Sequence, residues 1–131
     1  MSKRIPVLVV EDEEHIRKII EYNLKLDGFE VALAPNGRIG LDLAYEKKPD
    51  LILLDWMMPE MNGLEVLSEL KHDKRTERIP VFMLTAKGML GDIDRAYEVG
   101  ADDYITKPFD PVNLGKILKK KLEKCLEKQK G

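Results

Sequence analysis

Short apolar segments alternate with longer amphipathic ones along the whole chain. The apolar segments are rich in β-branched residues and predict strands at 5–10, 29–34, 50–55, 79–86 and 103–106. Apolar residues at helical spacing predict helices between and after these strands, at 13–28, 37–48, 63–73, 89–100 and 111–128. Five successive strand–helix units predict a parallel sheet with helices on both faces.

Right-handed crossovers leave few topologies for such a chain. One common doubly wound order is 2-1-3-4-5, in which the first and third strands are neighbours and the chain reverses direction between them. We therefore expect a flavodoxin-like α/β fold of the (βα)5 type, with a five-stranded parallel sheet in this order. We expect one domain over residues 1–131. Ligands of such sheets bind beyond the carboxyl ends of the strands, at the reversal.

Acidic residues stand where the first and third strands end. Glu11 and Asp12 follow the first strand, and Asp55 follows the apolar run 51–54 of the third. The predicted strand order brings these three carboxylates together. Clustered carboxylates repel one another, so they either share a proton or recruit a cation. An all-oxygen cluster with room for water suits Mg²⁺.

Two further polar groups are expected at the same edge of the sheet. Lys107 follows the fifth strand and offers an ammonium, while Thr85 ends the fourth strand and offers a hydroxyl. Mg²⁺ and lysine both bind phosphoryl oxygens. A carboxylate such as Asp55 can act as a nucleophile and form an aspartyl phosphate. The residues therefore predict phosphoryl transfer to Asp55.

Four separated motifs, in this order, resemble the receiver domain of two-component response regulators over nearly the whole chain. They are "VLVVEDEE", "DLILLDWMMPEMNG", "PVFMLTAKG" and "GADDYITKPF". The resemblance implies that Asp55 is phosphorylated by a histidine kinase or a phosphotransfer protein. It also implies that Mg²⁺ is held by Asp12, Asp55 and the backbone carbonyl of Met57, with Glu11 acting through water.

The resemblance implies further roles at the ends of the fourth and fifth strands. Thr85, Lys107 and the backbone of Ala86 would bind the phosphoryl oxygens. Tyr104 would be an aromatic switch that turns inward as Thr85 moves. The Lys107–Pro108 peptide bond would be cis. Such a domain regulates by accepting a phosphoryl group, and it catalyses only its own phosphorylation and dephosphorylation.

Each of these residues also has a simpler interpretation. Glu11 and Asp12 could merely cap the first helix, because acids favour a helix N-terminus. Asp55 could be a turn residue, although a turn residue would not need the apolar run before it. Lys107 could be one more solvated lysine in a chain with 35% charged residues. The four groups occurring together favour the phosphoryl site.

The motifs are most similar to receivers of winged-helix transcription regulators, which carry a second, DNA-binding domain. We expect a stand-alone receiver, because 131 residues leave no room for that domain. Ile93, Asn113 and Ile117 stand where the subfamily has Arg, Glu and Arg, which argues against its ion-paired dimer. We expect a monomer or weak dimer that contacts a downstream protein through the fourth helix, fifth strand and fifth helix, with Ile93, Tyr104 and Ile117 at the surface.

Three alternatives remain open. The chain could be the receiver fragment of a DNA-binding regulator that dimerises on phosphorylation. It could be a flavodoxin-like cofactor binder, although "EDEEH" has the wrong charge for a phosphate-binding loop. It could be an aspartyl-phosphate hydrolase, whose nucleophile would be expected on the first strand.

Composition bears on whether the chain folds, spans a membrane and resides in the cytoplasm. A content of 44% hydrophobic residues predicts a folded globule, and no apolar run approaches the length of a membrane span. A single cysteine, Cys125, allows no internal disulfide and makes the cytoplasm the expected location. Residues 116–131 carry a net charge of +5 and the remainder −7. The basic end lacks aromatic residues, so we expect a solvated helix face rather than direct nucleic-acid binding.

Overall fold

The computed structural model describes residues 3–86 and 92–130. One parallel sheet runs through it in the order β2-β1-β3-β4-β5, so the predicted flavodoxin-like topology is confirmed. Its strands are β1 (Ile5–Val10), β2 (Phe29–Ala34), β3 (Leu51–Asp55), β4 (Val81–Ala86) and β5 (Asp103–Lys107). The helices are α1 (Glu14–Leu26), α2 (Gly37–Lys47), α3 (Gly63–Lys71), α4 (Ile93–Val99) and α5 (Pro111–Lys130).

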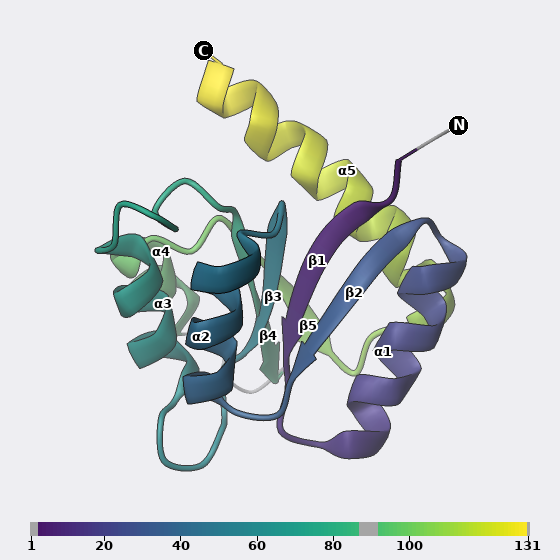
Figure 1. Cartoon of the computed structure of the whole chain (residues 1–131), viewed down its shortest axis with the longest axis horizontal. Coiled ribbons are helices and arrows are strands. Elements are labelled where there is room, and N and C mark those ends of the chain that lie inside the picture. Colours follow the sequence, from purple (N-terminus) through teal and green to yellow (C-terminus); the bar gives the residue numbers. More distant parts are fainter. Residues whose placement is uncertain (1–2, 87–91, 131) are drawn as a thin grey trace.

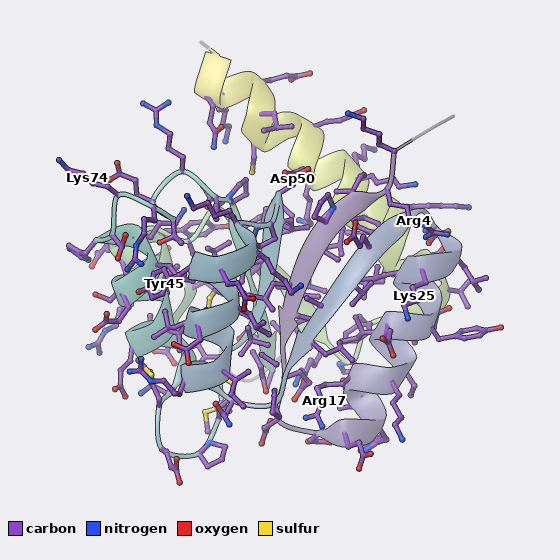
Figure 2. All side chains as sticks on the ribbon, in the orientation of Figure 1. Arg4, Arg17, Lys25, Tyr45, Asp50 and Lys74 are labelled. Atoms are coloured by element: carbon purple, nitrogen blue, oxygen red, sulfur yellow. The ribbon has the colours of Figure 1, made fainter. Side chains whose placement is uncertain are left out.

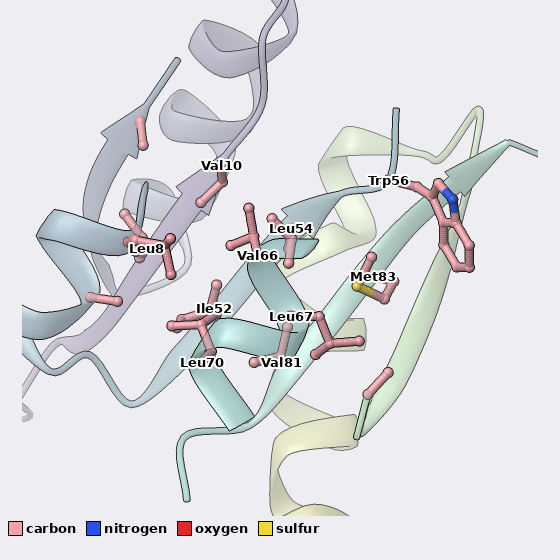
Figure 3. Close-up of a cluster of buried hydrophobic side chains, with 14 of the residues drawn as sticks. Leu8, Val10, Ile52, Leu54, Trp56, Val66, Leu67, Leu70, Val81 and Met83 are labelled. Atoms are coloured by element: carbon pink, nitrogen blue, oxygen red, sulfur yellow. The ribbon is translucent and has the colours of Figure 1, made fainter. Parts of the chain in front are cut away.

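Helices cover both faces of the sheet and give the protein two apolar cores. Figure 1 shows α2, α3 and α4 on one face and α1 and α5 on the other. All five residues of β3 are buried. Because successive strand residues point to opposite faces, Ile52 and Leu54 pack beneath α2 and α3 (Figure 3), whereas Leu51 and Leu53 pack beneath α1 and α5.

Side-chain caps position the helices that follow β2 and β3. The Asn36 side chain accepts a hydrogen bond from the Ile39 amide at the start of α2, at 2.9 Å. Asn62 and Glu65 form a reciprocal capping box at the start of α3. Such caps contribute roughly 1 kcal/mol each. They fix where the loops beyond β2 and β3 turn back onto the sheet.

Some element boundaries differ from the predicted ones. β4 begins at Val81 rather than residue 79, because the Ile79 amide donates to Thr76 and Pro80 has no amide hydrogen to donate. α5 continues to Lys130, past the predicted end at 128. The start of the predicted helix 89–100 lies in residues 87–91, outside the described residues.

One residue of the expected partner surface is buried. Ile93 is only 7% exposed, so its prediction as a surface contact is wrong for this structure. It lies three residues before the buried Ala96, and this spacing places both on the inward face of α4. Ile117 is 38% exposed and Tyr104 is half-buried, so these two side chains remain accessible.

Over the two described stretches, none of the helices has both the length and the apolar character needed to cross a lipid bilayer.

Candidate functional site

Three carboxylates meet at the carboxyl ends of β1 and β3. Glu11 and Asp12 follow β1, Asp55 ends β3, and the register pairs Val10 of β1 with Leu54 of β3. Each acid offers an oxygen within 4.8 Å of an oxygen from the others. The predicted convergence is therefore present in the structure, and it follows directly from the adjacency of β1 and β3.

Lys107 brings a positive charge to this cluster from the end of β5. Its Nζ donates to Oε1 of Glu11 at 2.7 Å and to Oδ1 of Asp55 at 3.2 Å. Glu11 is fully buried, and its Oε2 also accepts a hydrogen bond from the Glu13 amide at 3.1 Å. The Lys107 ammonium thus pairs with two buried carboxylates, one that follows β1 and one that ends β3.

The charges at the site do not balance. Burial, reinforced by the negative charge of Glu11 and only partly opposed by Lys107, raises the pKa of Asp55 to about 7. Burial pulls the pKa of Lys107 down, but its pairs with Glu11 and Asp55 outweigh this and leave it raised. The cluster favours additional positive charge, and its all-oxygen donors fit a hard divalent cation.

Asp12 differs from the other two acids in how it is held. Within residues 3–86 and 92–130, no hydrogen bond reaches its carboxylate from a side chain or an amide. Asp12 is not the cap of α1 either, because Glu13 occupies the N-cap position and makes no side-chain cap bond. The simpler interpretation of Asp12 as a helix cap is therefore wrong.

Arg17 of α1, which sequence reasoning missed, contacts the backbone of both β1 acids. Its Nη1 donates to the carbonyl oxygens of Glu11 at 2.8 Å and Asp12 at 2.9 Å. Helical side chains tilt toward the helix N-terminus. This tilt brings the guanidinium to the end of β1, but the sequence carried no residue-type signal for the contact, because its partners are backbone carbonyls.

The remaining predicted residues lie in or directly after β4 and β5. Thr85 is fully buried, and its hydroxyl donates to the Ala86 carbonyl at 3.3 Å. Tyr104 lies edge-on to the Tyr97 ring, with 6.5 Å between the ring centroids. The Lys107–Pro108 peptide bond is cis.

The loop after β3 folds back tightly against the strand end. The Gly63 amide donates to the Trp56 carbonyl at 2.8 Å, and a Cβ at Gly63 would stand 2.5 Å from the Asp55 carbonyl oxygen. Trp56 is 6% exposed, whereas Met57 is 63% exposed. Only glycine fits where α3 begins beside Asp55.

A separate groove lies at the opposite end of the sheet. It has a volume of about 730 Å³ and is lined by Ile5 at the start of β1, by residues that precede β3 and β4, and by one side of α5. Figure 2 shows Asp50, which lines this groove, and Arg17, which contacts the acids, at opposite ends of the molecule. The groove contains none of the acids and is not part of the site.

These features define a class of protein: a doubly wound α/β domain with an acidic cluster and a lysine at its switch point. The family model described as the response regulator receiver domain matches residues 7–119. The chain belongs to this family. It is a receiver domain of the kind that accepts phosphoryl groups in two-component signalling.

Curated relatives are transcriptional regulators. The phosphate regulon transcriptional regulatory protein PhoB of Pseudomonas aeruginosa is 47% identical over 113 residues, which cover 86% of this chain and 49% of that protein. The DNA-binding dual master transcriptional regulator RpaA of Synechocystis is 43% identical over 79% of this chain and 43% of that protein. The chain spans about half the length of the curated relatives it matches.

Solved structures of similar size share the fold. A putative response regulator from Chloroflexus aurantiacus superposes with a TM-score of 0.85 at 30% identity, over 92% of this chain and 99% of that one. The chemotaxis response regulator CheY4 of Vibrio cholerae gives a TM-score of 0.85 at 31% identity, over 91% and 99% of the two chains.

Proposed function

We propose that Asp55 is the phosphoacceptor of this receiver domain and that a phosphohistidine on a histidine kinase or phosphotransfer protein is the donor. The proposal is carried by one observation: Glu11, Asp12 and Asp55 meet at the carboxyl ends of the strands, where the Lys107 ammonium binds Glu11 and Asp55. We take residues 1–131 as one such domain.

The acidic cluster is assigned to Mg²⁺, because its donors are all oxygens and their charges are unbalanced. The carboxylates of Asp12 and Asp55 and the backbone carbonyl of Met57 are the proposed direct ligands, with Glu11 acting through water. When bound, the ion would neutralise charge on the phosphoryl oxygens.

The proposed reaction is an in-line displacement at phosphorus. A carboxylate oxygen of Asp55 forms the new O–P bond while the N–P bond of the phosphohistidine breaks, and the electron pair stays on the imidazole nitrogen. The Lys107 ammonium, already 3.2 Å from Oδ1 of Asp55, offsets the developing charge. Later attack by water releases inorganic phosphate and restores the carboxylate.

Phosphorylation would be read out through β4 and β5. Thr85 and the Ala86 amide would donate to the new phosphoryl oxygens, and the present 3.3 Å bond from Thr85 is long enough to be given up at little cost. Movement of Thr85 would let Tyr104 turn inward. The surface of α4, β5 and α5, including Tyr104 and Ile117, would then present a changed face to a downstream protein.

Labelling with a small phosphodonor tests the assignment. Wild-type protein with acetyl phosphate and Mg²⁺ should gain one phosphoryl group in its intact mass, and Asp55→Asn should gain none. Asp50→Asn is the matched control, because it removes an exposed carboxylate just before the opposite end of β3. Trp56, buried beside Asp55, reports binding by fluorescence. Labelling of Asp55→Asn at another residue would refute the assignment.

Two candidate settings for this domain differ in what phosphorylation does. We propose first that it acts as a stand-alone receiver, in which case the phosphorylated protein stays a monomer or weak dimer. The second candidate is the receiver part of a DNA-binding regulator, favoured by the transcriptional regulators among its relatives. That candidate predicts dimerisation on phosphorylation. Light scattering coupled to size-exclusion chromatography, with and without acetyl phosphate, separates the two.

A further inference from the structure

Arg17 connects the first helix to the loop that carries two of the three acids. Its Nη1 lies within hydrogen-bond distance of two successive carbonyl oxygens, those of Glu11 and Asp12. Its own amide donates to the Glu13 carbonyl at 3.0 Å, so the arginine is anchored in α1 while its guanidinium reaches back to the strand end. The contact fixes the orientation of two neighbouring peptide planes.

The two acids depend on this contact to different degrees. The carboxylate of Glu11 is restrained at both oxygens, by Lys107 at 2.7 Å and by the Glu13 amide at 3.1 Å. The Asp12 carboxylate receives no hydrogen bond within the described part of the chain. The direction in which Asp12 points is therefore set mainly by its backbone, and Arg17 holds that backbone.

We infer that Arg17 is a positioning residue that orients Asp12 toward a divalent cation at the site. The inference rests on the proposed function, because it assumes that Asp12 is a cation ligand. Arg17 acts by donating hydrogen bonds to backbone carbonyls. These bonds do not involve the Asp12 carboxylate, so its oxygens remain free to coordinate a cation. Groups that orient metal ligands in this way typically change metal affinity by about 10- to 100-fold when replaced.

Geometry and charge can be separated by substitution. The guanidinium is a planar fork with fixed donors, whereas a lysine ammonium is a flexible point charge. Arg17→Lys keeps the positive charge but loses the hydrogen bonds to the two carbonyls, and Arg17→Ala removes both the charge and the hydrogen bonds. Lys18→Met is the control, because Lys18 is the next residue of α1. Its side chain is 70% exposed, and its ammonium pairs only with Glu14 among the described residues.

The experiment is a calorimetric titration of each purified, full-length variant with Mg²⁺, after circular dichroism has established that the variant is folded. Arg17→Ala should raise the Mg²⁺ dissociation constant by about tenfold or more. Arg17→Lys should raise it by a smaller factor, and Lys18→Met should leave it at the wild-type value. If Arg17→Ala does not fold, Arg17→Lys decides the question.

Kinetics distinguish positioning of Asp12 from an effect on Asp55. Labelling by acetyl phosphate should need more Mg²⁺ in Arg17→Lys, yet reach a maximal rate within about twofold of wild type at saturating Mg²⁺. A wild-type Mg²⁺ affinity in folded Arg17→Lys, or an equal loss in Lys18→Met, would overturn the inference. A wild-type protein that binds no Mg²⁺ would instead overturn the proposed function, and the inference with it.

Discussion

Replacing Asp55 by Asn is expected to stabilise the metal-free protein, and by more at pH 8 than at pH 5. Asp55 is 4% exposed and lies beside the fully buried Glu11, with Lys107 as the nearby cation. Its pKa is raised from 3.8 to about 7 in the folded protein. Between these values the folded state binds more protons than the unfolded state, so the Asp55 contribution to stability falls as pH rises.

The size of the effect follows from the same shift. Each pKa unit corresponds to about 1.4 kcal/mol, so the shift sets a ceiling of roughly 4 kcal/mol on the cost of ionised Asp55 at pH 8. At pH 5 most of the folded protein is protonated at Asp55, and the ceiling falls to roughly 1–2 kcal/mol. The advantage of Asn should therefore grow by about 1–3 kcal/mol between pH 5 and pH 8. Lys107 keeps Glu11 as a partner, at 2.7 Å, in the variant.

Urea unfolding in the presence of a chelator, at pH 5 and at pH 8, measures this difference. The free energy of unfolding of Asp55→Asn minus that of wild type should be positive at pH 8 and smaller at pH 5. Asp42→Asn is the control, because that side chain is 65% exposed and pairs only with Arg38, at 3.9 Å, among the described residues. An Asn variant no more stable than wild type at pH 8, or an advantage that shrinks as pH rises, would refute the reasoning.

Three other substitutions test the framework of the site. Gly63→Ala should destabilise the protein by about 1–3 kcal/mol in urea unfolding, because its Cβ would stand 2.5 Å from the Asp55 carbonyl oxygen; an unchanged midpoint would show that the loop gives way freely. Lys71→Met should cost about 1–3 kcal/mol in the same assay, since the side chain is only 12% exposed and its ammonium binds the Ile79 carbonyl and the Asp102 carboxylate at 2.8 and 3.0 Å; a stabilised variant would contradict this. Lys107→Met should lower metal-free stability at pH 8 and slow labelling by acetyl phosphate, because it leaves buried carboxylates without their ammonium; normal labelling would count against its proposed role.

The strand order and the meeting of the acids could be predicted because both follow from local patterns. Leu51–Leu54 form a continuous apolar run, which marks a strand buried on both faces, and the repeated strand–helix units then restrict the topology. The start of β4 could not be predicted in this way. Ile79 continues the apolar pattern, but its amide is used in a turn with Thr76.

Side-chain direction is where sequence reasoning fell short. Ile93 was assigned to the surface on a motif alignment, but its rotation about the α4 axis turns it inward together with Ala96. Arg17 was overlooked because its partners are backbone carbonyls, and carbonyls carry no residue-type signal. Lys107 was found because its partners are acidic side chains, whose charge is visible in the sequence.

Stability and cation binding are opposed at this site for a single physical reason. The burial that raises the pKa of Asp55 and the repulsion from Glu11 both oppose folding of the metal-free protein, and a divalent cation would relieve both. A site whose own lysines and arginines neutralised the carboxylates would be stable without metal, but it would bind a divalent cation only weakly. Lys107 therefore offsets only part of the negative charge, while Arg17 acts on the backbone and leaves the Asp12 carboxylate free. On this argument, substitutions at the acidic cluster that stabilise the metal-free protein should weaken its binding of Mg²⁺. Lys71→Met, whose partners are Ile79 and Asp102, should destabilise the protein without changing Mg²⁺ binding.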